Sequence, residues 1–225
     1  MVKISEDIRM VARESAERIV RSGKRRSEFG SLSVRTEETQ IEDWTTGILG
    51  EMVFQKVLQD QGIEVGPVNL SVMPKGDGGS DFKVVILDGE IRTLRIPLDV
   101  KAVRLGSWLL VPENTFKKDA LYALVSVGQN EGDIEGMAFG WMFMDNDGNP
   151  FFRIPEGECL PRAMDASIAY WQGLKRARTR LKSRDMFPEV YLTDFRMKTT
   201  NLGLPKQALL TESYNWAWAL EKASE

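Results

Sequence analysis

Asp99 and Lys101 stand two residues apart in an apolar segment of this 225-residue chain. Apolar residues alternate with them: Leu98, Val100 and Ala102. Side chains two apart on a β-strand share one face, so a strand here would fix a carboxylate beside an ammonium group and bury the apolar residues on its other face. A carboxylate binds hard cations, and a lysine can orient or deprotonate a water molecule. The pair therefore predicts metal-assisted hydrolysis, with a solvated ion pair worth ~0–1 kcal/mol as the alternative.

A second aspartate, Asp81, opens the apolar run that precedes this segment. It follows the glycine-rich residues 76–79, for which a turn is the simplest interpretation. The runs 82–87 and 91–103 flank the dipeptide Asp88-Gly89, which is typical of the turn of a β-hairpin. The sequence therefore predicts that Asp81 lies at the start of one strand of a hairpin and the Asp-x-Lys pair on the other.

The register of this hairpin decides whether Asp81 and Asp99 share a face. Opposed residues of antiparallel strands point to the same side of a sheet, and a slip of one residue reverses every side chain. A strict two-residue turn gives the wrong parity for the two aspartates. We therefore expect a three-residue loop or a bulge at the turn, with Phe82 opposite Ile96.

A third acid, Glu51, closes the segment Gly47-Ile48-Leu49-Gly50-Glu51 inside a predicted helix. Two glycines in a helix interior cost roughly 1 kcal/mol each relative to alanine, so they often mark a close approach of the backbone. Here the helix could approach the sheet and carry Glu51 toward the aspartates. Three acids beside one lysine would form an oxygen cage for one or two Mg²⁺ ions.

The composition restricts the chemistry. The chain has no histidine and one cysteine, which excludes a Ser-His-Asp triad, a Cys-His pair, a zinc site with histidine or several thiolate ligands, and an internal disulfide. A metal must then be held by oxygen atoms, which favours Mg²⁺, with Mn²⁺ as a substitute. The formal net charge is -3, so a nucleic acid would have to meet local basic patches.

One basic run stands out near the C-terminal end of a predicted helix. Its members are Lys175, Arg176, Arg178, Arg180, Lys182 and Arg184. No acid interrupts the run, so we interpret it as a phosphate-contacting face, although charged helix faces are usually only solvated. Arg104 is assigned to the same role, and Lys117 with Lys118 form a further candidate patch. Trp216 and Trp218 are interpreted as core or interface residues.

The pattern of apolar residues indicates an α/β fold, with a mixed β-sheet flanked by helices, in one domain spanning residues 1–225. The predicted helices cover residues 4–22, 42–61, 164–184 and 206–222, and the predicted strands 82–87, 91–103, 121–127 and 137–144. The core would lie at about 41–145. The N-terminal helix and the helical region 161–225 would be elaborations.

No apolar run reaches the ~20 residues that a membrane span needs. The N-terminus lacks the apolar segment of a signal peptide. With its single cysteine, the chain is expected in a reducing cytoplasm, that of a prokaryotic cell or a phage-infected host.

Three segments together resemble the PD-(D/E)XK nuclease superfamily, in its phage and bacterial type. They are Gly-x-x-Gly-Glu ending at Glu51, Ser80-Asp81-Phe82, and Leu98-Asp99-Val100-Lys101. The matching stretch covers about residues 44–104, roughly a quarter of the chain. The resemblance implies a restriction-endonuclease-like core with extra C-terminal helices, and Mg²⁺-dependent hydrolysis of phosphodiester bonds in DNA.

The resemblance also assigns roles. Asp81 and Asp99 become metal ligands, the Val100 carbonyl a further ligand, Lys101 the catalytic lysine, and Glu51 an acid that binds metal directly or through water. The proline that usually precedes the first aspartate is replaced by Ser80. A Gln-x-x-x-Tyr element and a histidine motif are missing, which argues against the exonuclease modules fused to helicases.

The substrate stays open at this level. The leading hypothesis is a DNA endonuclease, and the alternatives are a structure-specific nuclease of the Holliday-junction type, a catalytically inactive DNA-binding relative, and an RNA-processing enzyme. A homodimer would supply two sites related by two-fold symmetry, as cutting both strands often requires, but the sequence itself does not show one.

Overall fold

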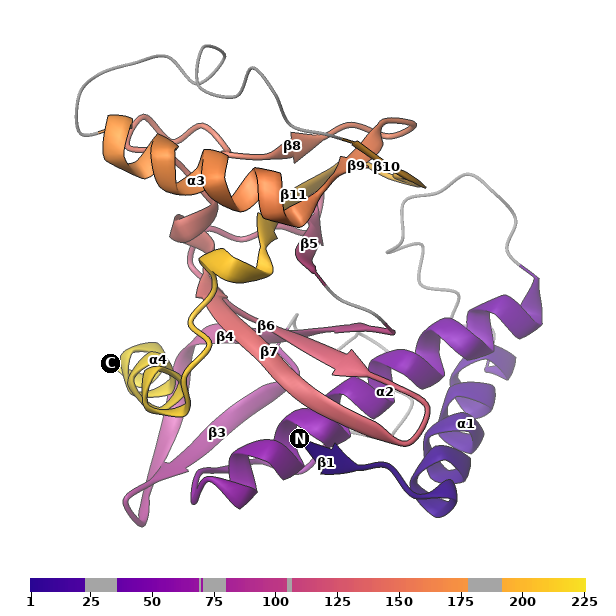
Figure 1. The fold of residues 1–225 in the computed structure, drawn as a ribbon. Helices are drawn as coiled ribbons and strands as arrows, with labels where there is room; N and C mark the ends of the chain where they lie inside the picture. The colour runs from indigo at the N-terminus through magenta and orange to yellow at the C-terminus, as the bar shows by residue number, and fades with distance from the viewer. Residues whose placement is uncertain (23–35, 69, 71–79, 105–106, 178–191) are drawn as a thin grey trace.

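A computed structural model describes residues 1–22, 36–68, 70, 80–104, 107–177 and 192–225 (Figure 1). Its main feature is a six-stranded mixed sheet in which β4 and β6 run parallel and the other neighbours run antiparallel. The strand order is β1 (Val2–Lys3), β7 (Glu131–Phe139), β6 (Leu121–Val127), β4 (Glu90–Val103), β3 (Phe82–Leu87) and β2 (Glu64–Val65). The predicted α/β class, a mixed sheet flanked by helices, is confirmed.

A second sheet of three strands combines distant parts of the chain. Its order is β5 (Trp108–Pro112), β11 (Asn201–Pro205) and β8 (Arg153–Ile154), and β9 (Cys159–Pro161) pairs separately with β10 (Leu192–Arg196). In Figure 1 this sheet and the helix α3 (Ala163–Ala177) lie above the main sheet. The C-terminal region 161–225, in which two helices are predicted, contains α3 and a further helix near the C-terminus and also supplies the strands β10 and β11 between them.

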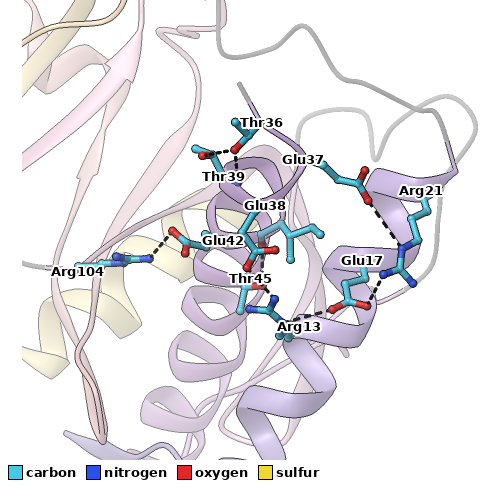
Figure 2. A network of polar contacts seen from close by, with 11 residues as sticks. Arg13, Glu17, Arg21, Thr36, Glu37, Glu38, Thr39, Glu42, Thr45 and Arg104 are labelled. Carbon is cyan, nitrogen blue, oxygen red and sulfur yellow. Dashed lines mark hydrogen bonds and ion pairs between the residues drawn. The ribbon is translucent and has the colours of Figure 1, made fainter. Parts of the chain in front are cut away.

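The first two helices form a pair joined by ion pairs. α1 (Glu6–Arg21) begins at Ser5, whose hydroxyl accepts from the Ile8 N–H, and α2 (Glu37–Asp60) begins in the same way at Thr36. Figure 2 shows exposed contacts between the helices, such as Arg13 with Glu38 at 2.8 Å. α2 starts five residues before the predicted 42, because its capping threonine and acidic first turn precede the apolar pattern.

The other predicted elements agree unevenly with the structure. Strands 82–87 and 121–127 are confirmed, and β4 extends the predicted 91–103 by one residue. The predicted strand 137–144 is confirmed only over residues 137–139, since β7 runs from Glu131 to Phe139 and the 3₁₀ helix η2 (Gly140–Phe143) follows it. The last helix is shorter than predicted, with a 3₁₀ turn η4 (Lys206–Ala208) before α4 (Ser213–Ser224). Of the predicted helix 164–184, residues 178–184 lie outside the described residues.

Helices within the described segments lack the combination of length and apolar character that a membrane span requires. The longest described helix, α2, has 24 residues but carries charged side chains along its length.

The main sheet separates two apolar clusters. On β6, the side chains of Leu121, Ala123 and Val125 belong to the cluster under α2 and α4, which we call the main core. The alternating residues Tyr122 and Leu124 belong to a second cluster with β5, β11 and α3. Both faces of the sheet are thus covered around β6, which is why this strand is apolar at nearly every position.

α2 lies directly against the sheet at Gly50. A Cβ atom added there would overlap the Cβ of Ala102 on β4, whereas one added at Gly47 would meet nothing within 4 Å. Of the two glycines predicted to mark a close approach, only Gly50 does so. It allows the helix backbone to lie directly on the strand that carries Asp99 and Lys101.

Substituting these two glycines gives a matched test. Gly47→Ala should raise the free energy of unfolding by up to about 1 kcal/mol, because alanine favours the helix and meets no neighbour. Gly50→Ala should lower it by about 1–3 kcal/mol, because the added methyl group forces the helix from the sheet. Urea denaturation of both variants measures the difference; equal effects would contradict the close contact.

Candidate active site

The β3–β4 hairpin turns on two residues. Asp88 and Gly89 have φ angles of 52° and 78°, the left-handed conformation that a type I′ turn requires, and Leu87 pairs directly with Glu90. The predicted three-residue loop or bulge at the turn is therefore wrong. The tight turn alone would leave the two aspartates on opposite faces.

An irregularity farther along the hairpin changes this register. Val84 pairs with Thr93, but two residues back Phe82 pairs with Leu98, so β4 contains three more residues than β3 between these pairs. The expected pairing of Phe82 with Ile96 is wrong by two residues. Since the shift is odd, it reverses the parity set by the turn.

The shifted register brings Asp81 beside Asp99. Phe82 and Leu98 are opposite one another and both are buried in the main core. One residue away, alternation directs Asp81 and Asp99 to the other face of the sheet. The Asp81 N–H donates to the Leu98 carbonyl at 2.8 Å, which fixes the backbone at this position. Asp81 thus reaches the face that the site requires, by a different route from the one predicted.

Just before β3 begins, side chains instead of backbone atoms accept hydrogen bonds from β4. The Val100 N–H donates to Oδ2 of Asp81 at 2.6 Å, and the Leu98 N–H donates to the hydroxyl oxygen of Ser80 at 3.2 Å. Because the N–H and C=O of one strand residue point to the same edge, the Val100 carbonyl is also directed to the Asp81 side of β4. A carboxylate and a carbonyl oxygen therefore meet at this edge.

Asp99 and Lys101 form an ion pair on the face opposite α2. The Lys101 Nζ lies 2.7 Å from Oδ2 of Asp99, and the two side chains are 27% and 24% exposed. The strand holds the pair rigidly, since Leu98 and Val100 are buried on its other face. The close contact predicted from the two-residue spacing is present.

Glu51 lies on the flank of α2 that faces β3. Contacts of two nearby residues of α2 show where this flank lies. The centroid of the Phe54 ring is 5.4 Å from that of Phe82 on β3, and Gln55 donates to the Gly66 carbonyl at 2.9 Å. Glu51 is one turn before Gln55, and Gly50 beside it rests on Ala102. The helix therefore places Glu51 near the β3 side of β4, but on the face of the sheet opposite to the one that carries Asp81 and Asp99.

The three acids do not form a closed cage. Among the residues that the structure describes, no three His, Cys, Asp or Glu side chains are close enough to hold a metal ion together. Mg²⁺ commonly takes only one or two carboxylates and keeps several waters. Asp81 and Asp99, with the Val100 carbonyl, fit that mode of binding, whereas Glu51 approaches from the other face of the sheet.

Tyr122 is a neighbour of the site that the sequence did not reveal. It lies opposite Asp99 in the parallel register of β4 and β6. Its hydroxyl accepts from the Lys117 N–H at 2.7 Å and lies 3.2 Å from the Lys117 carbonyl. Burial, and to a smaller degree the charge of Asp99, raise the pKa of Tyr122 to about 12, against the opposing effect of the Lys117 hydrogen bond. The neutral hydroxyl holds Lys117, and with it the loop between β5 and β6, beside the site.

The predicted nucleic-acid contacts are mostly not tested by this geometry. Arg104 forms an exposed ion pair with Glu42 of α2 at 3.4 Å (Figure 2), a contact worth little in water. Lys175 and Arg176 lie in the last turn of α3. The other four members of the basic run lie outside the described residues: Arg178, Arg180, Lys182 and Arg184.

Comparison of the chain with protein-family models, with curated proteins and with solved structures gives no match. The likeness to the PD-(D/E)XK superfamily therefore rests on the three sequence motifs alone.

Two substitutions of Asp81 separate its structural role from any chemical one. Asp81→Ala should lower the free energy of unfolding by about 1–3 kcal/mol, because the Val100 N–H loses its charged acceptor. Asp81→Asn retains an oxygen acceptor and should lose less than half as much. Urea denaturation of the two variants measures this order, and the reverse order would contradict the hydrogen bond.

The raised pKa of Tyr122 predicts a loss of stability in alkali. Between its ordinary value of 10 and about 12, the unfolded chain releases the proton while the folded chain retains it. Its contribution is thus fully present below pH 10 and is lost as the pH rises to about 12. Ultraviolet titration of Tyr122→Phe should show the loss of one phenolate that forms near pH 12; loss of a phenolate forming near pH 10 would contradict the burial.

Proposed function

We propose that this chain is a Mg²⁺-dependent DNA endonuclease of the PD-(D/E)XK type, acting in the cytoplasm of a prokaryotic cell or a phage-infected host. One observation carries the proposal: the Asp81 carboxylate is bonded to the Val100 amide, directly beside the Asp99–Lys101 pair. This arrangement supports the roles that the three motifs imply, on a mixed sheet with helices on its flanks. A restriction-endonuclease-like core is part of the same proposal.

The residues divide the work of hydrolysis. Asp81, Asp99 and the Val100 carbonyl would hold Mg²⁺, which when bound lowers the pKa of water and neutralises charge on the scissile phosphate. Lys101, held by Asp99, orients the attacking water or accepts its proton. Glu51 orients a water from the helix side. The rigid strand fixes the relative positions of these groups before the substrate arrives.

A DNA-binding protein without catalysis is the second candidate. Its supporting observation is that Asp99 is engaged by Lys101 and that the described acids form no three-member metal group. A structure-specific nuclease is a variant of the first candidate and differs from it in substrate alone. Association into a homodimer would let two such sites cut both strands.

Removal of Lys101 tests the proposed function. The purified protein is incubated with supercoiled plasmid, linear duplex, single strands and a four-way junction, in Mg²⁺, Mn²⁺ or EDTA. We expect cleavage in either metal and none in EDTA, and Lys101→Ala should reduce the rate by about 10²–10⁴-fold, the usual contribution of general acid–base catalysis. The preferred substrate distinguishes the kinds of nuclease.

The matched control is Lys56→Ala. Lys56 is an exposed lysine on α2 that pairs with Asp60, and its loss should leave cleavage unchanged. Asp99→Ala should abolish cleavage with the fold retained. Cleavage that survives Asp99→Ala would refute the proposed site, and binding without cleavage of any substrate would favour the second candidate.

A further inference from the structure

Two exposed tryptophans gather around the end of β7. Trp141 is 54% exposed and Trp218 is 43% exposed, whereas the neighbouring Trp216 is buried. The Trp141 ring stacks on Phe139 with a centroid distance of 5.8 Å, and Trp218 meets the same ring edge to face. The interpretation of both C-terminal tryptophans as core or interface residues thus holds for Trp216, while Trp218 leaves much of its ring open to solvent.

This aromatic group lies at the same end of the main sheet as the candidate active site, but Phe139 belongs to the main core, on the face opposite to the one that carries Asp99. Phe139 pairs with Leu121 on β6, and Leu121 pairs with Leu98 on β4. Two strand spacings of about 4.8 Å separate Phe139 from Leu98, which precedes Asp99. The backbones of Phe139 and Leu98 are therefore about 10 Å apart within the sheet.

Two exposed lysines lie between the aromatic group and the site. Gly140, the residue before Trp141, has no side chain where the carbonyl oxygens of Lys117 and Lys118 approach, and a Cβ there would overlap both. Lys117 is also joined to Tyr122, the neighbour of Asp99. The loop between β5 and β6 is therefore held against Gly140 on one side and against Tyr122 on the other. Over residues 117–119 it exposes two positive side chains, Lys117 and Lys118, and one acid, Asp119.

We propose that Trp141, Lys117 and Lys118 form a binding surface for single-stranded nucleic acid that passes around the end of the main sheet, from the aromatic group on one face toward the candidate active site on the other. An exposed indole face stacks on an unpaired base of any sequence, and the lysines contact the phosphates on either side of it. The bases of a duplex are already stacked on one another, so the surface favours a single strand or a frayed end. The link to cleavage rests on the proposed function, but binding to this surface does not.

The experiment measures binding without cleavage. Fluorescence anisotropy in EDTA compares a labelled single-stranded oligonucleotide with the duplex of the same sequence. The wild type should prefer the single strand, Trp141→Ala should weaken its binding about tenfold, and Trp141→Phe should retain most of it because a ring remains.

The lysines have a separate readout. For the double variant Lys117→Ala, Lys118→Ala, the slope of log K against log salt should become shallower by about 1.4, since each phosphate contact on a single strand contributes about 0.7. Lys56→Ala serves as the charge-matched control and should leave the slope unchanged. Thermal melting of each variant verifies that it is folded.

The outcomes separate this proposal from the nuclease hypothesis. Unchanged binding by Trp141→Ala, or no oligonucleotide binding by the wild type, overturns the proposal and leaves the aromatic group as a docking surface for protein. Cleavage activity measured in the same preparations would then still support the proposed nuclease function. Binding that depends on Trp141, in a protein that cleaves no substrate, supports the surface and favours the second candidate, a DNA-binding protein without catalysis.

Discussion

The pairing of β3 with β4 determines how the rest of the candidate site is arranged. The type I′ turn at Asp88 and Gly89 sets one register, and the three additional residues of β4 between Thr93 and Leu98 impose another. Burial explains why both persist. Phe82 lies against Phe54 of α2 and opposite Leu98 in the main core, and a slip of one residue would turn one of these large apolar side chains away from that core.

The close packing of α2 against β4 is the second determinant of the candidate site, after the pairing of β3 with β4. A helix bearing a side chain at Gly50 would stand farther from Ala102, and Glu51 would then recede from the edge of β4. The same contact covers the apolar face of the strand whose other face carries Asp99 and Lys101. The contact between Gly50 and Ala102 therefore fixes both the packing of the main core and the distance between Glu51 on α2 and Asp99 on β4.

The sequence predicted those features of the fold that depend only on residues close together in the chain. The runs 82–87 and 121–127 are apolar and bounded by turns, so their strands follow from the sequence. β5 and β11 did not, because each has five residues and ends in a proline, a residue that usually argues against a strand. Asp99 beside Lys101 follows from their spacing alone. Tyr122 could not be assigned to the site, because its contact with Asp99 arises from parallel pairing between strands distant in the chain.

The bonding of Ser80 and Asp81 to β4 has a further consequence for association between molecules. Strand edges with unpaired N–H and C=O groups are templates on which a second chain can add a strand, and proteins protect such edges with charges and irregular pairing. Here the hydroxyl of Ser80 and the carboxylate of Asp81 occupy the N–H groups of Leu98 and Val100. Whatever chemistry Asp81 performs, its negative charge also discourages intermolecular β-pairing at this edge, and thereby protects the folded chain against aggregation.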